Sequence, residues 1–155
     1  MSTGERPSRA AVLNAIESYL RSAYGDAVPP QVAARVETVR QWPAEDFYGC
    51  PAFERAPEDA RRYALRLGNP AYPPMKLVIE RMPTREQWFF RADTHDAHIR
   101  PEPTDPEHEA FCALMTRNRA LAAAIEGHWA GEGLPTFQAF LREDLERRAR
   151  STDRR

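Results

Sequence analysis

The spacing of apolar residues predicts two helices at the start of the chain. From residue 9 to residue 24 apolar side chains recur every three or four positions, as on one buried helix face: Val12, Leu13, Ile16, Tyr19, Leu20 and Tyr24. Ser8 can cap this helix and Gly25 suits its end. A second helix is expected to begin at Pro29 and Pro30, which favour a helix start, and to end at Trp42-Pro43. The short Pro-rich connection predicts a helical hairpin.

The helical pattern is lost between residues 42 and 60, where three prolines interrupt it. The same stretch contains Phe47, Tyr48 and Phe53. Disordered segments are poor in aromatic residues, so these side chains predict an ordered loop that is anchored by its aromatic rings.

Strand patterns follow over 61–68, 75–82 and 87–95. In the first of them Tyr63, Leu65 and Leu67 alternate with polar or small residues, which is the period of a half-buried strand. The other two are rich in β-branched or aromatic residues. Strands that follow one another usually pair, so the three segments predict an antiparallel meander.

Two further helices are predicted after the strands. The first begins near Pro106 and ends at Gly131 or Gly133, with one apolar face that includes Ile125 and Trp129. The last runs from about Thr136 and is expected to bury four side chains: Phe137, Phe140, Leu141 and Leu145.

The order of these elements predicts an α+β fold. It comprises an N-terminal helical hairpin, a three-stranded antiparallel meander and two C-terminal helices packed on one sheet face. With 155 residues the chain fits one domain, expected over 8–148. Residues 1–7 are expected to be a disordered segment, and 149–155 an Arg-rich flexible tail.

Composition restricts the class of protein further. The net charge of -1 gives no general electrostatic attraction to nucleic acid or to anionic lipid, and neither partner is expected. No apolar run approaches the length of a membrane span. Two cysteines, Cys50 and Cys112, cannot build a disulfide framework. A cytoplasmic location is therefore expected.

Histidine, aspartate and cysteine residues near the third strand form a candidate metal site. Its predicted ligands are Asp93, His95, His98, His108 and Cys112. The spacing His95-x2-His98 followed by His108-x3-Cys112 resembles the paired nitrogen and sulfur ligands of zinc sites. The metal hypothesis implies zinc or another divalent transition metal. The alternative is that these are ordinary polar residues after a strand, with Cys112 packed as a small apolar group, and that no cofactor is bound.

A second candidate is a surface for a partner protein or a small anionic ligand. Its predicted residues are Tyr72, in a Pro-rich connection, Lys76 and Arg91. Lys76 is the single lysine among 22 basic residues, and a lysine at a strand start can contact an anion as a point charge. The sheet face that carries Lys76 also carries Arg62, Arg66, Glu80 and Arg91.

The sequence thus leaves two functions open. The first is a protein- or ligand-binding module without catalysis, in agreement with the lack of a recognised phosphate-binding or nucleophile motif. The alternative is a metal-binding protein or a metal-dependent hydrolase that uses the Asp93–Cys112 neighbourhood. A homodimer through the sheet is also considered, because Trp88, Phe89 and Phe90 cannot all face one core.

Overall fold

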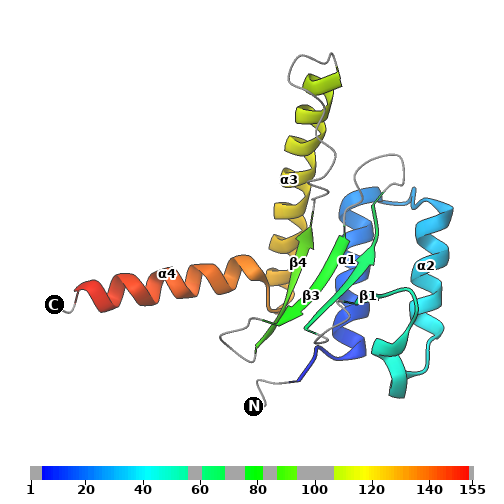
Figure 1. The fold of residues 1–155 in the computed structure, drawn as a ribbon, viewed down its shortest axis with the longest axis horizontal. Helices are drawn as coiled ribbons and strands as arrows, with labels where there is room; N and C mark the ends of the chain where they lie inside the picture. The colour runs from blue at the N-terminus through cyan, green and yellow to red at the C-terminus, as the bar shows by residue number, and fades with distance from the viewer. Residues whose placement is uncertain (1–4, 56–60, 69–75, 82–86, 94–106, 154–155) are drawn as a thin grey trace.

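Helices and strands follow one another in the predicted order, with one additional short strand (Figure 1). The computed structural model describes residues 5–55, 61–68, 76–81, 87–93 and 107–153. The elements are α1 (Arg9–Tyr24), α2 (Pro30–Gln41), a 3₁₀ helix η1 (Ala44–Gly49), β1 (Glu54–Arg55), β2 (Arg62–Arg66), β3 (Lys76–Arg81), β4 (Trp88–Asp93), α3 (Glu107–Gly131) and α4 (Phe137–Asp153). The predicted α+β class is confirmed.

The four strands form one antiparallel sheet in the order β1-β2-β3-β4. Tyr63 pairs with Ile79, and Ile79 pairs with Phe90 on the other side, so the predicted meander is present. The additional strand β1 pairs Glu54 with Ala64. It was missed because two residues are too short to show an alternating pattern.

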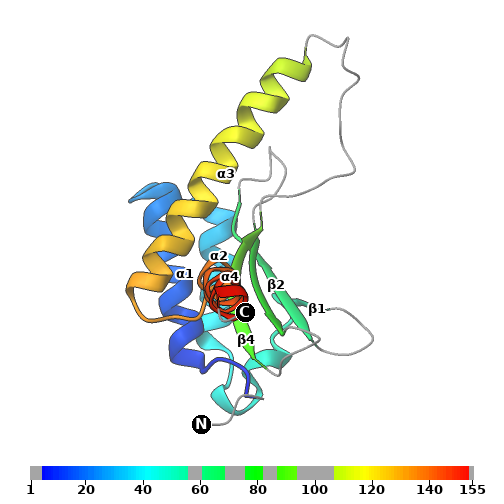
Figure 2. The ribbon, with the colours of Figure 1, turned by 90° about the vertical axis from the view of Figure 1, so that its left-hand side faces the viewer.

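The main core lies between the inner face of the sheet and the helices α1, α2 and α3, and Figure 2 shows α1 and α3 on one side of the sheet. Trp129 of α3 is fully buried there, and its ring centroid lies 5.8 Å from that of Phe90. Its indole Nε1 donates a 2.9 Å hydrogen bond to the carbonyl oxygen of Ala15 in α1. This one side chain therefore connects both helices to the sheet.

The part of the aromatic loop that the structure describes, residues 42–55, is ordered, as the sequence predicts, and residues 56–60 lie outside the described residues. Phe47 and Phe53 are buried, and the Tyr48 ring packs at a tilt against that of Tyr63 of β2, with ring centroids 4.8 Å apart. The guanidinium of Arg6 lies 4.5 Å from the centroid of the Tyr48 ring and donates a 2.8 Å hydrogen bond to the Tyr63 hydroxyl. This contact falls within the segment 1–7 that the sequence predicts as disordered.

The two C-terminal helices contact the sheet at different places: α3 packs against its inner face, whereas α4 begins beside β4 and extends away from the sheet (Figure 1). While α3 covers the inner face, α4 places Phe137 and Phe140 against Phe89 on the outer face, at centroid distances of 5.3 and 6.3 Å. The physical reason is the alternation along β4, which turns Phe89 away from the main core. The segment Pro135–Thr136 runs along β4, where Phe90 and Thr136 form a parallel bridge.

Most of α4 extends away from the β4 side of the sheet (Figure 1). As a result only part of the predicted apolar face of this helix is covered. Phe140 is buried, but Leu141 and Leu145 are 42% and 64% exposed, so the prediction that they are buried is wrong. The helix continues to Asp153, beyond the boundary expected at residue 148.

Side chains and a loop carbonyl contact the backbone of β4, the last strand of the sheet, and of β2 at Arg66, which β1 does not pair. The backbone N–H of Phe90 donates to the carbonyl of Pro135 at 2.8 Å, and that of Ala92 donates to Oε1 of Glu126 at 3.3 Å. On the opposite side, Arg35 donates to the carbonyl of Arg66 at 2.6 Å. Each of these contacts satisfies a backbone group that no strand of the sheet pairs.

Candidate functional site

Seven charged side chains gather on the outer face of the sheet, and we call them the charged face. They alternate along the strands with the core residues, which places them opposite α1 and α3. The set comprises four cations and three carboxylates: Arg62, Arg66, Lys76, Arg91, Glu54, Glu80 and Asp93.

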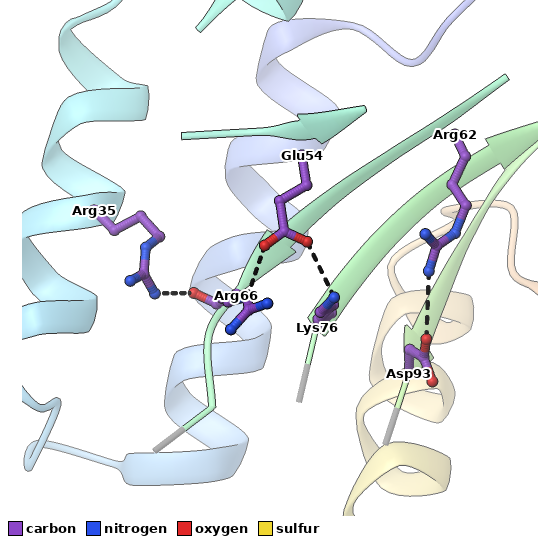
Figure 3. Close-up of polar contacts among 6 residues, drawn as sticks. All are labelled: Arg35, Glu54, Arg62, Arg66, Lys76 and Asp93. Carbon is purple, nitrogen blue, oxygen red and sulfur yellow. Dashed lines mark hydrogen bonds and ion pairs between the residues drawn. The ribbon is translucent and has the colours of Figure 1, made fainter. Parts of the chain in front are cut away.

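Glu54 links three strands through one carboxylate (Figure 3). Its Oε1 accepts a 2.7 Å hydrogen bond from Nε of Arg66 on β2, and its Oε2 accepts a 3.0 Å bond from Nζ of Lys76 on β3. Burial by itself would raise the pKa of Glu54, but the hydrogen bonds from Lys76 and Arg66 lower it below its ordinary value. Glu54 is therefore charged and holds both cations in place.

Two further ion pairs complete the charged face. Arg62 lies 3.5 Å from Asp93, and Arg91 lies 3.4 Å from Glu80 (N···O distances). The Arg66 backbone is fixed as well, because Arg35 of α2 donates to its carbonyl (Figure 3). Since the cations outnumber the carboxylates by one, the charged face keeps a positive excess.

The structure brings together two of the three residues that the sequence predicts as a ligand or partner surface. Lys76 and Arg91 both lie on the charged face, where Lys76 contacts Glu54 of β1 and Arg91 contacts Glu80 of the neighbouring strand β3. Tyr72 lies outside the described residues.

The predicted metal ligands are only partly within the described residues. Asp93 ends β4 and contacts Arg62, whereas His95 and His98 lie outside the described part of the chain. His108 and Cys112 lie in the first turns of α3, which extend past the strand ends (Figures 1 and 2), and Cys112 is exposed. Within the described ranges no group of three His, Cys, Asp or Glu residues could hold a metal ion. The metal site stays a prediction.

The aromatic residues of β4 do not provide an apolar surface for a partner. Trp88, Phe89 and Phe90 are 7%, 3% and 0% exposed. Phe89 does point away from the main core, as expected, but α4 of the same chain covers it. These three aromatic side chains therefore do not supply the contact surface of a homodimer, and the homodimer through the sheet or its edge stays a prediction.

A polar cavity between α1 and α3 was not found from the sequence. It has a volume of about 300 Å³ and is lined by Ser18, Arg21, Ser22, His128 and Glu132. The hydroxyl of Ser18 donates a 2.5 Å hydrogen bond to Oε1 of Glu132. A nucleophilic serine would instead donate to a base such as an imidazole, so this contact is typical of a helix-to-helix connection. The sequence feature that could have indicated this cavity is Ser18, a polar residue at one of the buried positions of α1.

No protein family model matches the chain, and comparison with curated proteins and with solved structures also finds no match. Among the helices of the described ranges, none combines the length and the apolar character needed to cross a membrane.

Proposed function

We propose that this protein is a non-catalytic binding module whose charged face docks an acidic segment of a partner protein. The observation that carries the proposal is the arrangement around Glu54. That carboxylate holds Arg66 through Nε, so the bond does not use the two terminal nitrogens of the guanidinium. The Arg66 side chain is 48% exposed and can present them to a partner.

The size of the charged face favours an extended partner over a small anion. Its cations lie on β2, β3 and β4, and neighbouring strands are about 4.8 Å apart. A set of cations spread over three strands matches several carboxylates in succession. Complementary charge of this kind contributes specificity and a faster association rate more than affinity.

The carboxylates of the charged face compete with such a partner. Glu54 already pairs with Arg66 and Lys76, which are cations that an acidic segment would contact. The same ion pairs hold the two cationic side chains in place. Binding therefore exchanges an internal carboxylate for an external one. The Arg66–Glu54 pair is half-exposed, and ion pairs of this type are worth only about 0–1 kcal/mol, so the exchange at Arg66 is not costly.

The test uses a short fluorescein-labelled poly-glutamate peptide and the full chain, with fluorescence anisotropy at low and high salt. We expect the peptide to bind at low salt and to be released by NaCl, because salt screens exposed charges. Arg66→Glu and Arg91→Glu should each weaken binding by about tenfold. Glu54→Gln removes the competing carboxylate and should strengthen binding.

The control is Arg119→Glu, which makes the same charge change at an exposed position of α3. It should leave peptide binding nearly unchanged. The proposal is wrong if the wild-type chain does not bind the peptide at low salt, or if Arg119→Glu weakens binding as much as Arg66→Glu. Inorganic phosphate that saturates the charged face and displaces the peptide would instead indicate a small-anion site.

A further inference from the structure

A second polar cavity lies between the segment before α1, the start of α1 and the loop after α2. It has a volume of about 280 Å³, close to the lower end of the usual range for small-molecule sites. Its charged lining comprises three arginines from three separate segments, Arg6, Arg9 and Arg55, and two carboxylates of η1, Glu45 and Asp46. None of these residues belongs to the charged face, so the cavity is a separate site.

Two of the arginines are positioned through the aromatic residues of the loop and the sheet. The guanidinium of Arg6 lies 4.5 Å from the centroid of the Tyr48 ring, and its Nη1 donates a 2.8 Å hydrogen bond to the Tyr63 hydroxyl. Arg55 pairs with Tyr63 in the register of β1 and β2, so both side chains leave the sheet on the same face. Neither arginine forms an ion pair with a carboxylate of the described residues.

Arg9 adds a guanidinium whose hydrogen bonds are incomplete. Its Nη2 donates a 2.5 Å hydrogen bond to the carbonyl oxygen of Arg40, near the end of α2. Its Nε–H is buried and has no hydrogen-bond partner among the described residues. Buried donors in proteins nearly always have an acceptor. A small rotation of this guanidinium towards an anion in the cavity would supply one, so Arg9 favours an anionic ligand.

The two carboxylates of the cavity do not neutralise the arginines. Asp46 is engaged within its own loop, because its Oδ2 accepts a 3.4 Å hydrogen bond from the indole Nε1 of Trp42. Its carboxylate also lies against Gly49, where the Cβ of any other residue would collide with it. Glu45 is exposed to solvent. Since the arginines outnumber the carboxylates by one, the cavity favours an anion over a cation.

We propose that this cavity binds a small phosphate monoester, whose phosphate oxygens accept hydrogen bonds from Arg6, Arg9 and Arg55. A phosphate group has three acceptor oxygens and up to two negative charges, which matches three guanidinium groups better than a single carboxylate does. Guanidinium groups also bind phosphate through two parallel N–H donors. The cavity is several times larger than the roughly 30 Å³ that a water molecule occupies, so it has room for a short organic group.

The experiment titrates the full chain with glycerol phosphate by isothermal titration calorimetry at low salt, with glycerate as the matched carboxylate. We expect glycerol phosphate to bind with a dissociation constant of about 1 mM or lower, and glycerate at least about tenfold more weakly. Arg55→Gln and Arg9→Gln should each weaken binding of glycerol phosphate by about tenfold. The control Arg142→Gln removes an arginine at an exposed position of α4 and should bind like the wild type.

A further variant separates this cavity from the charged face. Arg66→Glu, which should weaken docking of the acidic peptide, should leave binding of glycerol phosphate unchanged. The proposal is overturned if glycerol phosphate shows no saturable binding up to about 10 mM, or if Arg66→Glu weakens it while Arg55→Gln does not. Equal affinity for glycerate would rule out a phosphate site.

Circular dichroism of the variants checks that the fold is kept. Arg55 is exposed, so Arg55→Gln should fold like the wild type. If it does not, Arg6→Lys replaces it and is held to the same criterion. This variant keeps the positive charge but loses the two parallel N–H donors, so it should also weaken binding.

Discussion

Among the glutamates in the described part of the chain, Glu126 is the one whose side chain is buried. It is 5% exposed, and its carboxylate accepts a hydrogen bond from the backbone N–H of Ala92. Burial raises the pKa of Glu126, while the Ala92 bond and the charge of Arg91 oppose the shift. Burial therefore works against ionisation of the Glu126 carboxyl group, whereas its hydrogen bond from Ala92 favours the ionised form.

This predicts a specific pH dependence of stability. An acid with a raised pKa binds its proton more tightly in the folded state, so the free energy of unfolding falls as pH rises from about 4.5 through the raised pKa. Glu126→Gln cannot ionise and keeps an acceptor for the Ala92 N–H. Relative to the wild type it should gain stability as pH rises through this window. Urea unfolding followed by tryptophan fluorescence at several pH values measures the difference.

A second variant separates the charge from the hydrogen bond. Glu126→Ala leaves the buried Ala92 N–H without its acceptor and should lose about 1–3 kcal/mol at every pH. If wild type and Glu126→Gln show the same pH profile, the carboxylate is solvated and our account of it is wrong. The burial of Glu126 could not be predicted from the sequence, because a single glutamate on a helix is normally exposed.

At the scale of elements, the contact of α4 with Phe89 forms a second, smaller core. Phe140 is buried against Phe89 on the face opposite the main core. Periodicity in the sequence identifies α4 as amphipathic but not the surface that it meets. The sequence indicated that one of the three aromatics 88–90 faces away from the core, but it could not show that α4 would cover it. The short strand β1 was missed for a different reason, since only its pairing with β2 defines it.

We predict that Phe140→Ala releases α4 without unfolding the sheet. Truncation of a buried phenylalanine costs about 3–5 kcal/mol in a large core, and this smaller contact should lose somewhat less. Hydrogen exchange followed by mass spectrometry should show faster exchange in α4 and unchanged protection in β3. The exposed Gln138→Ala is the control and should leave both rates unchanged. Faster exchange of both elements in Phe140→Ala would mean that α4 and the sheet unfold together.

At the scale of the whole molecule, the sequence was most informative where apolar residues recur at a regular spacing over a whole element. Alternation over Tyr63, Leu65 and Leu67 predicted β2 and its buried face, and the three are buried in the structure. The charged face was predicted in part, because alternation also shows which charged residues share a sheet face. Its ion pairs depend on strand register, which one sequence does not specify here. The link between Glu54 and Lys76 spans 22 positions and has no local signal.

Trp129 connects the layers of the molecule, and its removal should affect the whole fold. Trp129→Phe loses ring volume in a fully buried position and the hydrogen bond to Ala15, and we expect a loss of about 2–3 kcal/mol. Thermal unfolding followed by circular dichroism should show a lower Tm in one cooperative transition. Trp42→Phe, a half-buried tryptophan after α2, should lower the Tm less. Equal losses in the two variants would contradict the central place of Trp129.

The contacts made by the backbone of β4, and by β2 at Arg66, have a consequence for how the protein can associate. Along β4 the backbone N–H groups of Phe90 and Ala92 already donate to Pro135 and Glu126. On β2 the carbonyl of Arg66 already accepts a hydrogen bond from Arg35. A foreign strand that aligned with β4 would have to displace a buried carboxylate before it gained a ladder bond. Growth of the sheet into cross-β aggregates is hindered at that position, and partners there must be recognised through side chains instead of main-chain pairing.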